Sequence, residues 1–214
     1  MISNIIILLN KKNNTNYIFF IIGIISNFFD LLTIPLIALY LPLLTYILLI
    51  EQENKSSKDK IKIIIKLSII WFIGYTFTWI TKWIISDIFF NRNLLITAIK
   101  QIKYRVKGQN ITSIESIGYN IKYLNLKVYI IIINIVLNII RIFLPNHKNL
   151  NTNDNNINIY YLMALIPIIW YGLIPSHSKI HYFFTYRLLY ITMFSFNIII
   201  VQCFDILIAN KKTS

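Results

Sequence analysis

The chain alternates long apolar segments with short polar ones, and most of the apolar segments have no polar face. Residues 17–50 form one such run, in which Asp30 is the only charged residue. A single helix of that length would measure about 50 Å, well beyond the roughly 30 Å hydrocarbon core of a bilayer. We expect the run to break at Asp30 and Pro35, because a charge is costly in lipid and proline cannot donate a backbone hydrogen bond.

The rest of the pattern predicts an all-α, polytopic integral membrane protein with about six transmembrane helices in a single domain. The composition agrees, since 57% of the residues are hydrophobic and only 14% are charged, whereas soluble domains carry roughly a quarter charged residues. The expected spanning helices cover residues 17–29, 31–50, 63–86, 127–145, 158–175 and 183–209.

The polar connection at 87–126 contains a segment with a different pattern. At 93–106 apolar residues recur three and four positions apart, with cations between them, which is typical of an amphipathic helix on a membrane surface. The apolar positions are Leu94, Leu95, Ala98, Ile99 and Ile102, and the cations are Lys100, Lys103, Arg105 and Lys107.

The formal charge of +13 does not indicate nucleic-acid binding, because lysines that flank apolar segments mark topology and attract anionic lipids. The lysine-rich loop at 51–66 and both termini are expected on the cytoplasmic side of the cell membrane. The cations of 87–126 and 175–187 then lie outside, against the positive-inside rule. Either they serve another purpose or the topology differs. The single cysteine, Cys203, leaves neither a disulfide framework nor a cysteine metal site.

The stretch "PSHSKIHYFFTYR" at 175–187 gathers two histidines within an apolar part of the chain. A helix that begins after Pro175, with Ser176 as its cap, would place His177 and His181 on one face. Such a pair can hold zinc, but a zinc site needs a third protein ligand and no acid stands nearby. We therefore expect no metal and no organic cofactor. The stretch is either an interfacial belt or a site for anion recognition or proton transfer, with Lys179 and Arg187 as cations and Tyr186 as a stacking face.

Two further positions have two interpretations each. Lys82 is either a snorkelling lysine beside the aromatic pair Trp79 and Trp83 or a cation that faces a cavity and binds a phosphate or carboxylate. In the second case Asp87 could belong to the same site. Asp30 is either the cap of the helix that follows it or an ionisable group that faces the bundle interior.

Three stretches, "GIISNFFDLLTIPLIALYLPL", "GYTFTWITKW" and "PIIWYGLIPSHSKIHYFFTYR", resemble segments of polytopic bacterial membrane proteins encoded among genes for cell-surface polysaccharide synthesis. The pattern there reads W-Y-x-x-x-x-N-H-S-x-I-H-x-x-F-x-Y-R. The matching residues are Trp170, Tyr171, His177, Ser178, Ile180, His181, Phe184, Tyr186 and Arg187, while Ser176 stands where the pattern has asparagine.

This resemblance implies a membrane-embedded, glycosyltransferase-like protein that handles lipid-phosphate-linked sugars. The relatives are about twice as long, so the chain corresponds to their C-terminal half and is either a truncated enzyme or no enzyme. The phosphate contacts would be Lys82, Lys179 and Arg187, and the catalytic candidates are Asp30, His177 and His181. The alternative is a non-enzymatic multi-pass module, such as a transport or flippase component or an inactive fragment. Expected partners are membrane lipids, a polyprenyl-phosphate-linked sugar and other membrane subunits.

Overall fold

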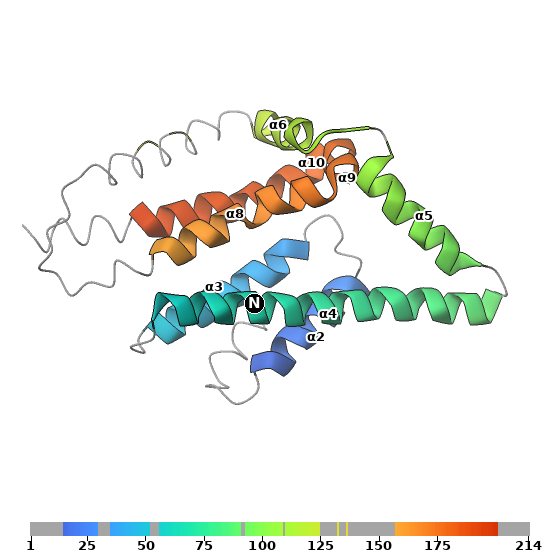
Figure 1. Ribbon diagram of the computed structural model, residues 1–214, viewed down its shortest axis with the longest axis horizontal. Helices are drawn as coiled ribbons and strands as arrows, with labels where there is room; N and C mark the ends of the chain where they lie inside the picture. Colours follow the sequence, from blue (N-terminus) through green and yellow to red (C-terminus); the bar gives the residue numbers. More distant parts are fainter. Residues whose placement is uncertain are drawn as a thin grey trace, which may run out of the picture.

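The computed structural model describes residues 15–29, 35–51, 56–90, 93–108, 110–124 and 157–200, together with Ile132 and Val136. Within these residues all regular structure is helical, which confirms the predicted all-α class. The longest element is α4 (Ser57–Phe90), which packs against α2 (Thr15–Phe28) and α3 (Pro35–Glu51) (Figure 1). A second group of helices lies above these three in the same view.

The first apolar run divides in the region where the sequence places a break. Helix α2 ends at Phe28 and α3 begins at Pro35. Proline suits the first turn of a helix, because its missing N–H would have had no intrahelical partner there and its backbone angle is already helical. Helix α3 therefore begins at Pro35, four residues after the predicted start at residue 31. Asp30 itself lies outside the described residues.

Helices α2 and α4 meet through two glycines. A Cβ added to Gly23 would lie 2.2 Å from the carbonyl oxygen of Trp71, and one added to Gly74 would lie 2.2 Å from the carbonyl oxygen of Phe20. Both distances are far below van der Waals contact, so the two backbones touch directly. Small residues that let helix backbones approach in this way are typical of helix pairs in membranes.

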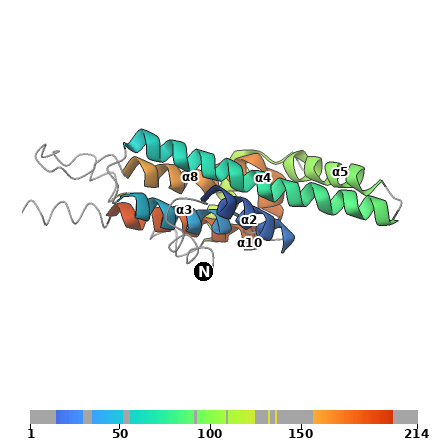
Figure 2. The same cartoon turned by 90° about the horizontal axis from the view of Figure 1, so that it is seen from below.

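The second group contains α5 (Leu94–Lys107), α6 (Ser113–Tyr123) and α8 (Ile157–Leu173). Short helices α9 (Pro175–Ile180) and α10 (Tyr182–Thr185) follow, then a 3₁₀ turn at Tyr186–Leu188 and a helix that continues to residue 200. Figure 1 shows α5 crossing from the end of α4 to α9, and α6 lying beside α9 and α10. From below, α4 and α5 form one side of the molecule (Figure 2).

The last helix joins the two groups. Thr192 donates a hydrogen bond to the carbonyl oxygen of Ala164 in α8, at 2.8 Å. On α3, the Tyr40 hydroxyl lies 2.8 Å from the Ser195 hydroxyl, and both side chains are buried. Neutral, fully paired hydroxyls of this kind are tolerated in an apolar interior.

Helix α6 was not predicted from the sequence, although its start carries a recognisable signal. The Thr112 side chain accepts a hydrogen bond from the Glu115 backbone N–H, and the Glu115 carboxylate accepts one from the Thr112 N–H. This reciprocal capping box satisfies two N–H groups that a helix start leaves unpaired. Thr-Ser-Ile-Glu is the corresponding sequence pattern.

The predicted cap of α9 is wrong. Helix α9 begins at Pro175 itself, Ile174 occupies the cap position without a side-chain hydrogen bond, and Ser176 is buried inside the helix. The first-turn preference of proline explains the difference. The two histidines nevertheless come together, because His181 follows α9 directly as the link to α10.

The described residues contain fewer long spanning helices than the six predicted. Among the described residues, two helices are long and apolar enough to cross a membrane, at 57–90 and 182–200. Spans were also predicted at 17–29, 31–50 and 158–175. The corresponding helices α2, α3 and α8 are apolar but shorter than a spanning helix. Helix α8 ends at Leu173, shortly before Pro175, because a residue that precedes proline disfavours the helical conformation. Apart from Ile132 and Val136, the span predicted at 127–145 lies outside the described residues, as does 201–209.

Candidate functional site

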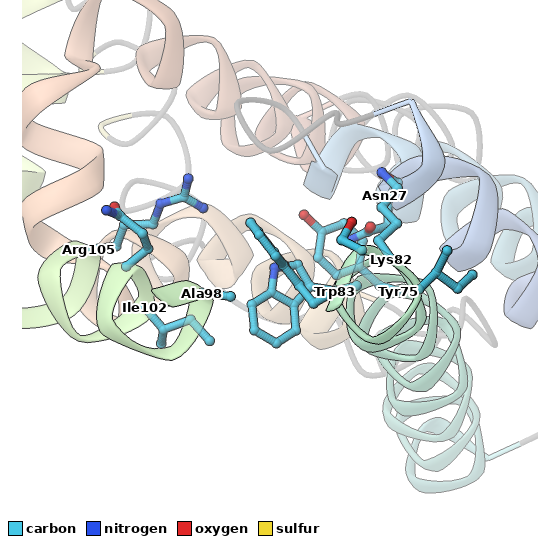
Figure 3. Close-up of a pocket in the computed structure, with 11 residues that line it drawn as sticks. Asn27, Tyr75, Lys82, Trp83, Ala98, Ile102 and Arg105 are labelled. Atoms are coloured by element: carbon cyan, nitrogen blue, oxygen red, sulfur yellow. The ribbon is translucent and has the colours of Figure 1, made fainter. Parts of the chain in front are cut away.

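A pocket of about 610 Å³ opens between α4, α5 and the end of α2 (Figure 3). It combines aromatic, polar and cationic side chains, and none of the described residues that line it is acidic. Its polar and aromatic lining consists of Asn27, Tyr75, Trp79, Lys82, Trp83, Ser86, Gln101 and Arg105. Of the elements predicted from the sequence, 17–29, 63–86 and the surface helix at 93–106 contribute residues to this pocket.

Lys82 enters the pocket from α4 and holds the end of α2. Its ammonium donates to the carbonyl oxygens of Asn27, at 2.6 Å, and Phe28, at 3.1 Å, and lies 5.7 Å from the centroid of the Phe28 ring. The last carbonyls of a helix lack intrahelical partners and carry partial negative charge, so a cation there is stabilising. An ammonium has three N–H groups, and these two bonds leave one for a ligand.

The aromatic pair Trp79 and Trp83 lies on one face of α4. The rings of Trp79 and Trp83 lie 6.2 Å apart in an edge-to-face arrangement, and both line the pocket. The indole of Trp83 lies between Lys82 and the α5 wall in Figure 3. The pocket thus offers large apolar surfaces next to its cations.

Asp87 has a different role from the one expected of it. Its carboxylate accepts hydrogen bonds from the backbone N–H groups of Leu94 and Leu95, the latter at 3.2 Å. It therefore caps α5 from a position on α4, and its negative charge suits the positive end of the α5 dipole. Asp87 is not among the pocket's lining residues.

Arg105 is the site residue that sequence reasoning missed. The sequence assigned it to the surface cations of 93–106, but the structure places it in the pocket wall opposite Lys82 (Figure 3). No carboxylate in the described ranges forms an ion pair with it. The spacing of Ala98, Ile102 and Arg105 on one helical face was the available signal, but which neighbour that face meets depends on the tertiary fold.

His177, in α9, and His181, directly after it, form a close pair, and α9 contacts α5. Their ring centroids are 4.7 Å apart, and His177 is only 5% exposed, with an Nε2 atom that has no hydrogen-bond partner in the described structure. Burial, together with the nearby His181 and Arg105, lowers the pKa of His177 from 6.5 to about 4. His177 is therefore neutral at physiological pH, which suits a hydrogen-bonding role better than phosphate binding.

A buried polar network joins α6 to α9 and α10. The Asn120 amide donates to the carbonyl oxygens of Ser116, at 2.9 Å, and Ser178, at 3.0 Å. The Thr185 hydroxyl lies 2.7 Å from the Asn120 amide oxygen, and the Tyr171 hydroxyl donates to the Thr185 carbonyl at 2.7 Å. The Asn120–Ser116 bond lies within α6, and the other three join different helices, so the network fixes α9 and α10 against α6.

The remaining predicted site residues lie on the α6 side of α9. Lys179 forms an ion pair with Glu115, at 3.6 Å. The Tyr186 ring meets the Tyr123 ring edge to face, and the Arg187 guanidinium lies 5.3 Å from the Phe184 ring centroid. Asp30 lies outside the described residues. The structure thus separates Lys82 from Lys179 and Tyr186, which the sequence had assigned to one site. The described ranges contain no cluster of three metal-ligating side chains.

No family model matches the sequence, and no curated protein or solved structure matches it. Function is therefore inferred from the chemistry of the residues described above.

Proposed function

We propose that the chain is a multi-pass membrane protein that binds a lipid-phosphate-linked sugar for cell-surface glycan synthesis. The observation that carries this proposal is the pocket between α4 and α5, whose described lining holds Lys82 and Arg105, two tryptophans and no acid. A phosphate diester or monoester meets a charged donor from each wall there. Arginine presents paired N–H donors that match phosphate geometry, and the tryptophans suit a lipid chain or a sugar ring.

The outer surface of α4 supports a membrane location. Large apolar side chains recur three and four positions apart along one stripe of this helix and are exposed: Ile65, Ile69, Phe72, Ile73, Phe77, Ile80, Ile84 and Ile88. The stripe is about 35 Å long at 1.5 Å per residue, comparable with a hydrocarbon core of roughly 30 Å. Water would solvate such a surface poorly, whereas lipid matches it.

The shorter apolar helices fit the same environment. Helices α2, α3 and α8 pack with α4 or with the helix at 182–200 and need not each cross the bilayer in full. Helix α5 carries exposed Lys100, Lys103 and Lys107 at one end of the bundle, where they would contact anionic lipid headgroups. In this proposal the pocket would lie at the boundary between lipid and water, where a lipid-linked phosphate is found.

A second candidate function is a binding module without catalysis, such as a transport or flippase component. One observation favours it: the acid nearest the pocket in the chain, Asp87, is engaged in capping α5. A glycosyl transfer needs a base for the acceptor hydroxyl. His177, with a pKa of about 4, is a weak base, which leaves His181 and Asp30 as the catalytic candidates of the transferase.

Binding is tested with the full-length protein in phosphatidylcholine nanodiscs, with tryptophan emission as the readout because Trp79 and Trp83 line the pocket. Polyprenyl phosphate should change the emission and unphosphorylated polyprenol should not. Arg105→Met should weaken binding by about tenfold or more, as for a lost charged hydrogen bond, while the exposed Lys103→Met should not. Equal binding of the two lipids would refute the proposal.

Catalysis is tested separately with a radiolabelled polyprenyl-phosphate-linked sugar. Transfer of the label to an added glycan identifies a transferase, and its loss in His181→Ala with unchanged lipid binding would assign that histidine. Saturable binding without transfer would instead support the module.

A further inference from the structure

Four tyrosines form a continuous aromatic surface on the α6 side of α9. We call it the tyrosine face, and its members are Tyr119, Tyr123, Tyr182 and Tyr186. Ring centroids lie 6.2 Å apart for Tyr119 and Tyr182, 4.9 Å for Tyr123 and Tyr182, and 5.1 Å for Tyr123 and Tyr186. Tyr119 and Tyr123 are four residues apart, and so are Tyr182 and Tyr186. This spacing places the two members of each pair on the same side of their segment.

The tyrosine face is accessible and its hydroxyls are unused. Tyr119 and Tyr123 are each 46% exposed. Within the described part of the chain, none of the four hydroxyls has a hydrogen-bond partner. A tyrosine that serves packing alone normally buries its ring and pairs its hydroxyl. Tyr119 and Tyr123 instead expose nearly half of their surface, while Tyr182 and Tyr186 are half-buried and Tyr186 also packs against the hydrophobic core.

A fixed pair of opposite charges borders the tyrosine face at Tyr119. The Lys179 ammonium lies 4.6 Å from the Tyr119 ring centroid and 3.6 Å from the Glu115 carboxylate. Glu115 is held in place because it also accepts the Thr112 N–H in the capping box of α6. The border therefore offers an acceptor and a donor side by side, with no net charge.

We propose that the tyrosine face binds a neutral carbohydrate. A pyranose ring has an apolar C–H face that can lie on Tyr119 or Tyr182, and its hydroxyls both donate and accept hydrogen bonds. The Glu115 carboxylate accepts from one hydroxyl and the Lys179 ammonium donates to another. The neutral border favours an uncharged glycan over an acidic one.

This inference rests on the proposed function and extends it to a second substrate. The pocket takes the lipid-phosphate-linked sugar, and the tyrosine face takes the glycan chain that receives or accompanies it. Helix α9 lies between α5 and α6 (Figure 1), so His177 and His181 stand between the two binding surfaces. A bilayer aromatic belt would need the rings at headgroup level but would need no matched ion pair on one of them.

The test uses the full-length protein in nanodiscs on an array of neutral and acidic bacterial-surface oligosaccharides. The wild type should bind neutral members, and Tyr119→Ala and Tyr182→Ala should each weaken binding by about threefold to tenfold, the loss typical of one aromatic contact. Tyr119→Phe should weaken binding less than Tyr119→Ala does, because it keeps the aromatic ring. Tyr17→Ala, an exposed tyrosine on α2, serves as the matched control and should bind as the wild type does.

Two results would overturn the inference: no binding to any neutral oligosaccharide, or binding unchanged in both alanine variants. A separate experiment tests whether lipid, rather than a glycan, covers the tyrosine face. A fluorophore on Tyr119→Cys in a Cys203→Ser background should resist quenching by nitroxides attached to lipid headgroups, and strong quenching would place the face in the bilayer and refute the proposal. Polyprenyl phosphate binding by Tyr119→Ala should equal that of the wild type, so failure of the tyrosine face and failure of the pocket are distinguishable.

Discussion

The ammonium of Lys82 lies 2.6 Å from the backbone carbonyl oxygen of Asn27, so a charged side chain on α4 closes the end of α2. The sequence offered two interpretations of this lysine, snorkelling toward the interface or binding an anion. The structure adds a third role, because the ammonium pairs with helix carbonyls 54 and 55 residues away in the chain. This role and ligand binding are compatible, since one N–H of the ammonium remains.

Lys82→Met should lower the free energy of unfolding by about 1–2 kcal/mol, because two charged hydrogen bonds to a helix end are lost. Thermal unfolding in nanodiscs, followed by circular dichroism, measures the change. Lys66→Met, at an exposed position of the same helix, is the control and should change stability by less than about 0.5 kcal/mol. Equal stability of the Lys82 variant and the wild type would show that the hydrogen bonds from Lys82 to the end of α2 do not stabilise the fold.

Gly23→Ala and Gly74→Ala should each separate α2 from α4, because the new methyl group would overlap a backbone carbonyl of the other helix. Overpacking of this kind costs about 1–3 kcal/mol or more. Gly118→Ala is the matched control, since nothing lies within 4 Å of its added Cβ, and it should stabilise α6 by up to about 1 kcal/mol. Equal melting temperatures for Gly23→Ala and Gly118→Ala would argue against direct backbone contact.

Asn120→Ala should detach α6 from α9, because it leaves the Ser178 carbonyl and the Thr185 hydroxyl without one of their partners. The expected loss is about 1–3 kcal/mol. Hydrogen–deuterium exchange should accelerate in peptides that cover 175–185 and remain unchanged in those that cover 57–75. Lys122→Ala, an exposed change on the same helix, should leave both regions as in the wild type. Uniform acceleration in both regions would instead indicate global destabilisation.

Acidification should destabilise the protein through His177. Its pKa falls from 6.5 in the unfolded chain to about 4 in the folded one, so between these values the unfolded chain binds more protons. Stability is then complete above about pH 6.5, is lost as the pH falls toward 4, and levels off below. Burial opposes the protonation of His177 most strongly, and the neighbouring His181 and Arg105 add to this effect.

The measurement is the unfolding free energy of wild type and His177→Gln at pH 7.5 and pH 5. The wild type should lose more stability than the variant, and the subtraction removes the contribution of carboxylates common to both. An identical pH dependence in the two proteins would show that His177 is not buried in its neutral form.

The helices could be predicted from the sequence better than the site could. The apolar run at 17–50 and its break follow from local chemistry, namely the length of the run and the preference of Pro35 for a helix start. Helix α6 also had a local signal in Thr112 and Glu115, although within the polar connection at 87–126 only residues 93–106 were predicted as a helix. Lengths were harder to predict, because where α4 ends depends on Asp87, which has to meet the start of α5.

The site depends on contacts that no local pattern contains. Lys82 and Arg105 lie on different helices, and only their packing makes them two walls of one pocket. Conversely, His177 and Lys179 are two residues apart in α9 but have different neighbours. His177 lies beside His181, whereas Lys179 contacts Glu115 and Tyr119 of α6. Proximity along the chain suggested a single site, whereas the fold makes two surfaces.

Lys82 and Asp87 stand five residues apart on α4, and the first fixes α2 while the second fixes α5. Each residue of an α-helix advances by about 1.5 Å and turns by about 100°. One inserted or deleted residue between the two positions would therefore swing one anchor around the helix relative to the other and open the pocket wall. The number of residues in this short part of α4 therefore sets the relative directions of the two side chains. Insertions and deletions should be tolerated far better in the loops than between residues 82 and 87.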